Sequence, residues 1–206
     1  VIGFYLQPAV GGKRFSFDYW KAVADLDNVV AFKSAPFDRY MTLDLVRGCA
    51  FSERSDKVAL YTGNDDNIVI DLLTKYEFNV NDKLVCKRFV GGLLGHWSVW
   101  THNVVGMFEI LKSHREDKYI PSYLLALAAQ VTDCNGAFFD VKNNFKGCIA
   151  GIHEVLRRQG LMEGIWCLNP RETLSPGQKE EIDRVYKAYT HLNDDEFVRR
   201  NIAKWK

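Results

Sequence analysis

The chain has 206 residues, and 47% of them are hydrophobic, so it can bury a core and is not globally disordered. Lys and Arg (27) almost balance Asp and Glu (26), and the formal net charge of +1 argues against a polybasic nucleic-acid binder or a membrane-surface protein. No apolar run approaches the roughly 20 residues of a membrane helix, and the N-terminus does not have the pattern of a signal peptide. Five scattered cysteines without a C-x-x-C pair favour reduced thiols and a cytoplasmic protein, and the histidine spacing indicates no metal site.

The first half of the chain alternates strand-like and helix-like segments. The expected strands are 2–6, 29–33, 57–61 and 95–100, and the expected helices are 16–26, 40–51, 65–74 and 103–114. Ser16 precedes the first helix as a candidate N-cap. Strands that alternate with helices of this length predict four βα units, a parallel sheet and the α/β class. Segment 76–90 interrupts the last unit, and its two apolar runs around Asn81-Asp82-Lys83 predict an inserted hairpin.

Beyond about residue 116 the pattern becomes mainly helical. Apolar spacing predicts helices over 123–131, 145–159, 175–190 and 193–205, with Gly160 as the residue that ends the second of them. Segment 133–142 is expected to be irregular, with Asn135-Gly136 as a turn. The chain is therefore divided into 1–115, the βα units, and 116–206, a helical extension.

Lys33 is the first candidate for chemistry. Alternation places Val29, Ala31 and Lys33 on one face of their strand and Phe32 on the other, where helices would pack. In a (β/α)8 barrel Lys33 would then point inward at the end of the strand where such barrels keep their active sites. A partly desolvated lysine has a lowered pKa, and its neutral amine can form a Schiff base with a ketone. The structural alternative is a strand-end lysine that extends its ammonium to solvent.

Tyr5 is the second candidate, because it also lies near the carboxyl end of a strand. Its phenol could relay protons to and from a substrate. The alternative is a core tyrosine with a satisfied hydroxyl group.

Two further segments carry polar residues after expected strands. In Thr62-Gly63-Asn64-Asp65-Asp66, Gly63 would allow close approach of a ligand and Asp65 could bind a substrate hydroxyl or, alternatively, cap the next helix. His96 follows a glycine-rich stretch and is either an acid–base group or a structural histidine. The glycines there do not have the G-x-G-x-x-G spacing of a dinucleotide site.

Together these segments resemble the dihydrodipicolinate synthase/N-acetylneuraminate lyase family of Schiff-base (β/α)8 barrels, and most closely its divergent, uncharacterised dihydrodipicolinate-synthase-like branch. The segment around Tyr5 is similar to the family's fifth-strand Y-N-x-P motif, although Leu6-Gln7 departs from it. Asn28 to Ser34 is similar to the sixth-strand lysine motif, and the 28 residues from Tyr5 to Lys33 match the family's interval. Gly63 to Asp66 is similar to the G-x-D-[DE] motif after the seventh strand, and Gly95 to Ser98 to G-x-[IV]-S on the eighth.

The resemblance implies a lyase, a class I aldolase that acts on a 2-oxo acid such as pyruvate. Lys33 would form the Schiff base and Tyr5 would shuttle the proton. Gly63, Asp65, Asp66, His96 and Ser98 would line the substrate end. No separate cofactor is implied, because the lysine iminium itself is the electron sink.

The resemblance also implies that this chain holds strands five to eight of a (β/α)8 TIM barrel, followed by the C-terminal helical extension. We expect strands one to four on an upstream segment, since a half barrel exposes two sheet edges and half of its interior. Family members are often homo-oligomers, and neither a nucleic-acid nor a membrane partner is expected. The alternative is a non-catalytic scaffold, an inactive half-barrel that needs an upstream partner segment.

Overall fold

The computed structural model describes residues 1–205, and the chain divides into two compact units. The first contains 1–94 and 111–125, and the second contains 95–110 and the chain from 126 onward. The expected boundary near residue 115 falls inside the 111–125 segment, which packs with the first unit. Each unit is described separately below.

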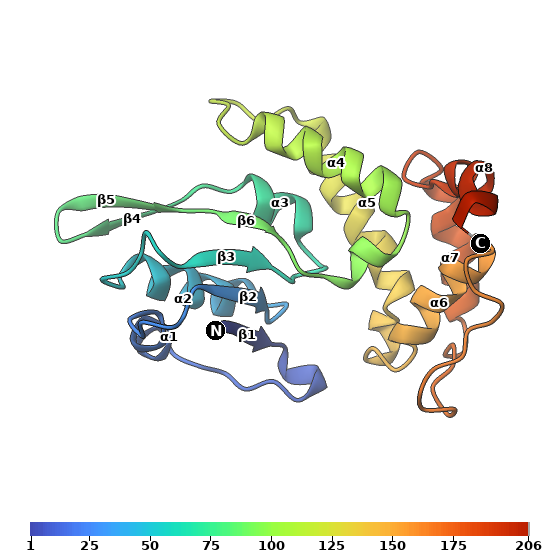
Figure 1. The fold of residues 1–206 in the computed structure, drawn as a ribbon, viewed down its shortest axis with the longest axis horizontal. Helices are drawn as coiled ribbons and strands as arrows, with labels where there is room; N and C mark the ends of the chain where they lie inside the picture. The colour runs from blue at the N-terminus through green and yellow to red at the C-terminus, as the bar shows by residue number, and fades with distance from the viewer. Residues whose placement is uncertain (206) are drawn as a thin grey trace. The chain divides into compact units, whose positions relative to one another are not determined.

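The first unit is built on a four-stranded parallel sheet, so the predicted α/β class with parallel strands is confirmed (Figure 1). The spatial order is β1 (Ile2–Leu6), β2 (Ala31–Ala35), β3 (Ala59–Thr62) and β6 (Phe89–Gly92). Each of the first three strands is followed along the chain by a helix, and each new strand joins the same edge of the sheet. This is the arrangement expected of successive βα units.

The helices of this unit are α1 (Phe17–Ala24), α2 (Arg39–Ala50) and α3 (Ile68–Leu73). The predicted N-cap is confirmed, since the Ser16 hydroxyl accepts the backbone N–H of Tyr19 at 3.2 Å. Asp38 caps α2 in the same way, through the N–H of Met41. Helix α1 packs on α2, and its Trp20 lies edge-on to Phe32 of β2. Phe32 therefore faces the helices, as its position in the strand predicts.

Alternation along the strands gives the sheet two different faces. One cross-strand row packs against the helices and consists of Gly3, Phe32, Leu60 and Phe89. The next row lies on the opposite face and consists of Phe4, Lys33, Tyr61 and Gly91. Phe32, Leu60 and Phe89 are fully buried, whereas Phe4 is 50% exposed. We call the two sides the helix face and the open face.

The inserted hairpin is confirmed as a two-stranded antiparallel sheet of β4 (Tyr76–Val80) and β5 (Lys83–Lys87). Asn81 and Asp82 form its turn and both have positive φ, which matches the twist of a tight hairpin. Figure 1 shows this hairpin extending away from the four-stranded sheet. The predicted second run, 84–90, is split, because residues from Phe89 onward join the parallel sheet as β6.

The predicted strand over 95–100 is wrong. Gly95–Ser98 is a short 3-10 helix, and β6 supplies the fourth strand instead. The Leu93 N–H still bonds the Thr62 carbonyl at 2.8 Å, but Trp100 then adopts a φ of 51° and its side chain is buried in the second unit. Burial of this large ring among helices overrides the local strand preference.

The second unit is helical, as predicted, although its boundaries differ. Its elements include α5 (Tyr123–Phe138), α6 (Cys148–Arg158), α7 (Gln178–Ala188) and α8 (Asp195–Trp205), with α4 (Thr101–His114) beginning in it. The predicted turn at Asn135-Gly136 is wrong, because α5 continues through it to Phe138. Cys134, Ala137 and Phe138 extend its buried stripe at helical spacing. Gly160, with a φ of 73°, follows α6 as predicted.

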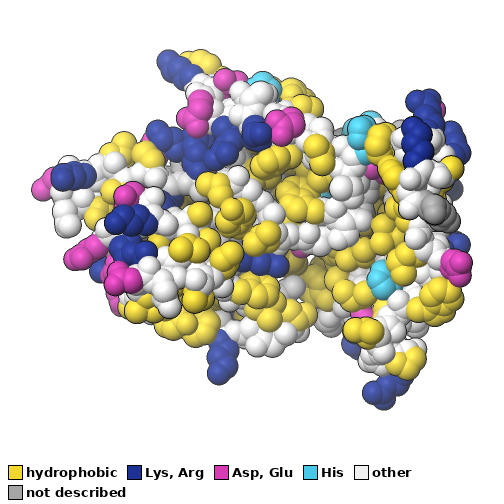
Figure 2. Space-filling model, viewed as in Figure 1, with side chains coloured by type: hydrophobic (Ala, Val, Ile, Leu, Met, Phe, Trp, Pro, Cys, Tyr) yellow, Lys and Arg dark blue, Asp and Glu magenta, His cyan; other side chains and the backbone are white. Residues whose placement is uncertain are grey.

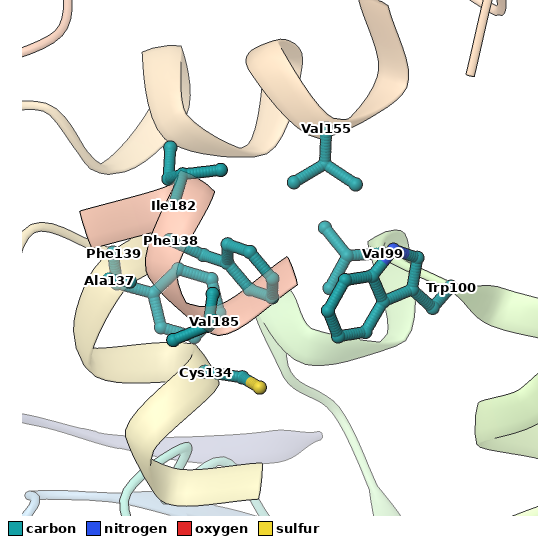
Figure 3. Close-up of a cluster of buried hydrophobic side chains, with 9 residues drawn as sticks. All are labelled: Val99, Trp100, Cys134, Ala137, Phe138, Phe139, Val155, Ile182 and Val185. Atoms are coloured by element: carbon teal, nitrogen blue, oxygen red, sulfur yellow. The ribbon is translucent and has the colours of Figure 1, made fainter. Parts of the chain in front are cut away.

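One apolar cluster forms the centre of this unit (Figure 3). Trp100 and Phe138 meet edge to face with ring centroids 5.0 Å apart, a favourable aromatic geometry. The buried members are Val99, Trp100, Cys134, Ala137, Phe138, Phe139, Val155, Ile182 and Val185. Among residues 1–205, no helix has both the length and the apolar character that crossing a membrane requires.

Candidate functional site

Lys33 lies on the open face of the sheet, but in the middle of β2 and not at its carboxyl end as expected, because the strand runs from Ala31 to Ala35. Its ammonium nitrogen is 4.4 Å from the centroid of the Phe4 ring on β1. Ile2 and Phe4 make this face apolar and are 55% and 50% exposed. In the view of Figure 2, hydrophobic side chains gather over the region of the strands. Lys33 is therefore a half-buried cation on an apolar surface.

The surroundings of Lys33 make its amine easier to deprotonate than that of a solvated lysine. Burial lowers the pKa of Lys33 from its ordinary value, and the nearby negative charge of Asp65 partly opposes that shift. Gly63, the first residue after β3, leaves space for the lysine side chain. A Cβ at Gly63 would lie only 2.7 Å from the Lys33 Cε and 2.8 Å from the Ala35 Cβ. The structure thus places Gly63 against the Lys33 side chain and Asp65 near enough for its charge to act on the lysine.

Tyr5, which the family resemblance implies as the proton shuttle for Lys33, does not share a face with Lys33. Tyr5 pairs in register with Ser34, not with Lys33, so its side chain lies on the helix face. It is fully buried, with its ring centroid 4.5 Å from that of Trp20. Its hydroxyl oxygen accepts the Phe15 N–H at 3.3 Å, and burial raises its pKa. Tyr5 therefore has the properties of a core tyrosine with a satisfied hydroxyl.

Tyr61 is a phenol that the sequence reasoning did not single out. It pairs in register with Lys33, so the two side chains share the open face, and its ring lies over Gly91. Strict alternation from the buried Leu60 would have placed Tyr61 on that face, but only the register between β2 and β3 identifies Lys33 as its neighbour.

The segment from Thr62 to Asn67 is held by a carboxylate that sequence reasoning also missed. Asp71 of α3 is fully buried and accepts hydrogen bonds from several donors. The donors are the Arg39 guanidinium (2.6 Å), the Thr62 hydroxyl (2.6 Å), the Asn64 amide (3.0 Å), the Asn67 amide (3.1 Å) and the Tyr76 hydroxyl (3.3 Å). A buried aspartate on an apolar helix was the available signal, because such a group requires partners.

Asp66 lies next to this network. Burial raises the pKa of Asp66, and the positive charge of Arg39 partly offsets the rise. The alternative role predicted for Asp65, as a helix cap, is wrong. Helix α3 begins at Ile68, and Asn67 is its N-cap residue.

His96 and Ser98 belong to the second unit, whereas Lys33, Gly63, Asp65 and Asp66 belong to the first. His96 is buried, and its Nδ1 lies 2.6 Å from the Asn135 Oδ1. Burial lowers the pKa of His96 to about 4, which keeps the ring neutral at ordinary pH. Ser98 is exposed. The structure thus agrees with the structural reading of His96.

A second desolvated lysine in the first unit gives a useful contrast. Lys87 is only 9% exposed, and burial lowers its pKa as well. Its ammonium group, however, donates to the carbonyls of Ser55 (2.5 Å) and Val58 (2.9 Å). Lys87 therefore has a structural role, and it is an internal reference for the reactivity of Lys33.

Among residues 1–205, no group of three or more His, Cys, Asp and Glu side chains is arranged to hold a metal ion. The five cysteines are all free thiols, as expected. No protein-family model matches the chain, and no curated protein matches it. Its function is therefore argued from the geometry of the Lys33 site.

Proposed function

We propose that the chain carries the Schiff-base lysine of a class I aldolase or lyase that acts on a 2-oxo acid of the pyruvate type. The observation that carries the proposal is the environment of Lys33, a half-buried amine with a lowered pKa beside Gly63 and Asp65. Lys87 is the contrasting case, because its ammonium group is held by two backbone carbonyl groups.

The chemistry needs a neutral amine and a way to stabilise positive charge. The Lys33 nitrogen attacks the ketone carbon of the 2-oxo acid to give a carbinolamine. Loss of water then leaves a protonated imine with its positive charge on the nitrogen. Asp65, which favours the cationic form of Lys33, would stabilise that charge as well. Removal of a proton from the adjacent carbon gives an enamine, which can form a carbon–carbon bond, and the reverse sequence breaks one.

A phenol on the same face as Lys33 is needed if tyrosine relays protons in this reaction. Tyr5 lies on the helix face, whereas Tyr61 shares the open face with Lys33. We therefore assign the relay to Tyr61 in place of Tyr5.

We also propose that the four parallel strands and the helices that follow them form half of a (β/α)8 barrel. The parallel order β1-β2-β3-β6, with its helices on one face, supports this proposal. The open face, with half-exposed Ile2 and Phe4, would be the inner wall of the barrel. The complementary half, on an upstream segment, would cover it.

Borohydride trapping tests the proposed chemistry. The protein is incubated with pyruvate and other 2-oxo acids, reduced with borohydride and digested, and its peptides are weighed by mass spectrometry. We expect an adduct on Lys33 and none on Lys87, and Lys33→Ala should abolish it. Absence of a Lys33 adduct with every 2-oxo acid, in the presence of the upstream half, would show that the proposal is wrong.

Exchange of the pyruvate methyl hydrogens in D2O, followed by NMR, tests the tyrosine assignment. Tyr61→Phe should keep borohydride trapping but slow the exchange, because imine formation does not need the relay and enamine formation does. Tyr5→Phe is the matched control and should leave the exchange rate unchanged. The opposite pattern would return the relay to Tyr5.

The alternative function is a non-catalytic scaffold, and the open face favours it. An apolar surface that contains Ile2 and Phe4 is suited to contact with another segment or with a second copy of the chain. Lys33 would then be an interface lysine. Turnover of any 2-oxo acid by the wild-type protein that is lost in Lys33→Ala would exclude this alternative.

A further inference from the structure

The buried carboxylate of Asp71 connects two loops that follow neighbouring strands. Thr62, Asn64 and Asn67 donate to it from the segment after β3. Arg39, at the start of α2 after β2, donates to it as well, and Tyr76 of β4 completes the set. One carboxylate that accepts this many hydrogen bonds, most of them from uncharged donors, is a strong local constraint on the backbone.

The residues that flank Asp65 and Asp66 are both anchored to Asp71. The Asn64 Nδ2 lies 3.0 Å from the Asp71 Oδ2, and the Asn67 Nδ2 lies 3.1 Å from the Oδ1. The backbone N–H of Asn67 also donates to the Asn64 carbonyl at 2.9 Å. These contacts hold residues 65 and 66 in a short closed turn, so the position of Asp65 depends on both ends of that turn.

Both ends of the connection between β3 and this turn are also bonded to β2 and the segment after it. The Gly63 N–H donates to the Ser34 carbonyl at 2.6 Å, directly beside Lys33 in sequence. The Phe37 N–H donates to the Asn64 Oδ1 at 3.1 Å, and Phe37 has a φ of 51°, an unusual conformation for a large side chain. A bulky residue remains in this region when its surroundings over-determine it, and the bond to Asn64 is part of that constraint.

We propose that Asp71 is a positioning residue that holds Asp65 and Gly63 against Lys33 and so sets the reactivity of the lysine amine. Its catalytic meaning rests on the function proposed above. The effect of Asp71 on the Lys33 amine is a property of the folded chain and can be measured without any substrate.

A test must separate the charges that act on Asp71 and Asp66 from the charge that acts on Lys33. Arg39 and Tyr76 face Asp71, and Arg39 also acts on Asp66, together with Asp38 and Asp71 itself. Asp65 is the charged group that acts on Lys33, and it raises the lysine pKa against the effect of burial. Displacement of Asp65 therefore lowers the pKa of Lys33. Loss of the Asp71 carboxylate should also lower the pKa of Lys33, because Asp71 holds the turn that carries Asp65.

Competitive labelling measures this effect. The protein is treated with a trace of acetic anhydride over a range of pH, and acetylation of Lys33 and Lys87 is read by peptide mass spectrometry. Asp65→Asn should move the Lys33 midpoint down by about half a pH unit or more, because one attractive charge is lost. Asp71→Asn should move it in the same direction, and the double variant should move it no further than Asp65→Asn alone.

Asp25→Asn is the matched control. Asp25, at the carboxyl end of α1, also accepts several hydrogen bonds, from Lys21 (3.1 Å), Ser52 (2.6 Å) and the Glu53 N–H (2.9 Å). Its loss should lower the melting temperature and leave the Lys33 midpoint where it is. An Asp71→Asn variant that is less stable but has an unchanged Lys33 midpoint would overturn the proposal, as would an Asp65→Asn variant without a shift.

If Asp71→Asn does not fold, Thr62→Val is used in its place, since it removes one donor to Asp71 and keeps the side-chain shape. A lowered Lys33 midpoint in Thr62→Val supports the positioning role, and an unchanged midpoint overturns it. Borohydride trapping on the same variants separates the two proposals. A shifted midpoint without any pyruvate adduct supports the positioning role and contradicts the aldolase. An adduct on Lys33 with an unshifted midpoint supports the aldolase and contradicts the positioning role.

Discussion

The two faces of the parallel sheet are made by the same strands and yet have opposite properties. On the helix face, Phe32 and Tyr5 are fully buried against α1, with Trp20 between them. On the open face, one residue away in each strand, Phe4 is half exposed and Lys33 lies beside it. The helix face has a stabilising role and the open face carries the candidate chemistry. Alternation along a strand of five residues thus places the side chains that stabilise the fold on one face and the candidate reactive lysine on the other.

The largest expected effect is a difference in stability between the two faces. Phe32→Ala removes a fully buried ring and should cost about 3–5 kcal/mol, whereas Phe4→Ala on the open face should cost about 1 kcal/mol. Urea unfolding of the two variants, followed by circular dichroism, measures the difference. Equal losses would mean that the open face is packed as tightly as the helix face.

Gly63→Ala should come next in size and should affect both stability and reactivity. The new Cβ would overlap the Lys33 Cε and the Ala35 Cβ, and such overpacking typically costs about 1–3 kcal/mol. The displaced lysine should also change its acetylation midpoint. Gly91→Ala on the same face is the control, because its Cβ would meet the Tyr61 ring at an ordinary 3.4 Å. If both variants behaved alike, Gly63 would have no special relation to Lys33.

Tyr5→Phe is expected to affect stability without affecting Lys33. It removes the acceptor of the Phe15 N–H bond and should cost about 0.5–1.5 kcal/mol. The Lys33 midpoint and the yield of borohydride trapping should stay at their wild-type values, since the two side chains lie on opposite faces. A changed Lys33 midpoint in this variant would break the separation of the faces.

Phe4→Leu should have the smallest effect and should act on the pKa alone. The ring below the Lys33 ammonium favours the charged form, and such contacts are worth about 0.5–1 kcal/mol where exposed. Their loss lowers the pKa of Lys33, so the acetylation midpoint should fall by less than about one pH unit. A midpoint that rises would show that the ring does not stabilise the ammonium.

The sequence predicted the strands and helices of the first unit well, because their signals are local. Alternation located β1 and β2, and Ser16 and the Asn81-Asp82 turn act as their residue types predict. Around Gly95 and Asn135 the local signal failed. Glycine and asparagine favour turns, but the apolar stripe through Cys134 and Phe138 continues α5 across Asn135, whose side chain meets the buried His96.

The candidate site was predicted only in part, because some of its features depend on local sequence signals and others on contacts between distant residues. The lowered pKa of Lys33 was expected from its position on a strand, whereas its grouping with Gly63 and Asp65 was expected only from the family resemblance. The face of Tyr5 was not, because it depends on the register between β1 and β2, and a one-residue difference turns a side chain to the opposite face. The role of Asp71 also depends on donors distant in sequence, such as Arg39.

By itself, the sequence determined the α/β class, the succession of βα units and the lysine around which the function is proposed. The class and the βα units follow from hydrophobic periodicity and from turn and capping residues, which act over a few positions, whereas Lys33 was singled out by the family resemblance. The tertiary structure decided which tyrosine shares a face with Lys33 and which carboxylate holds the adjoining loop. Those relations depend on strand register and on the need of a buried charge for partners, and both bring together residues that are far apart in the chain.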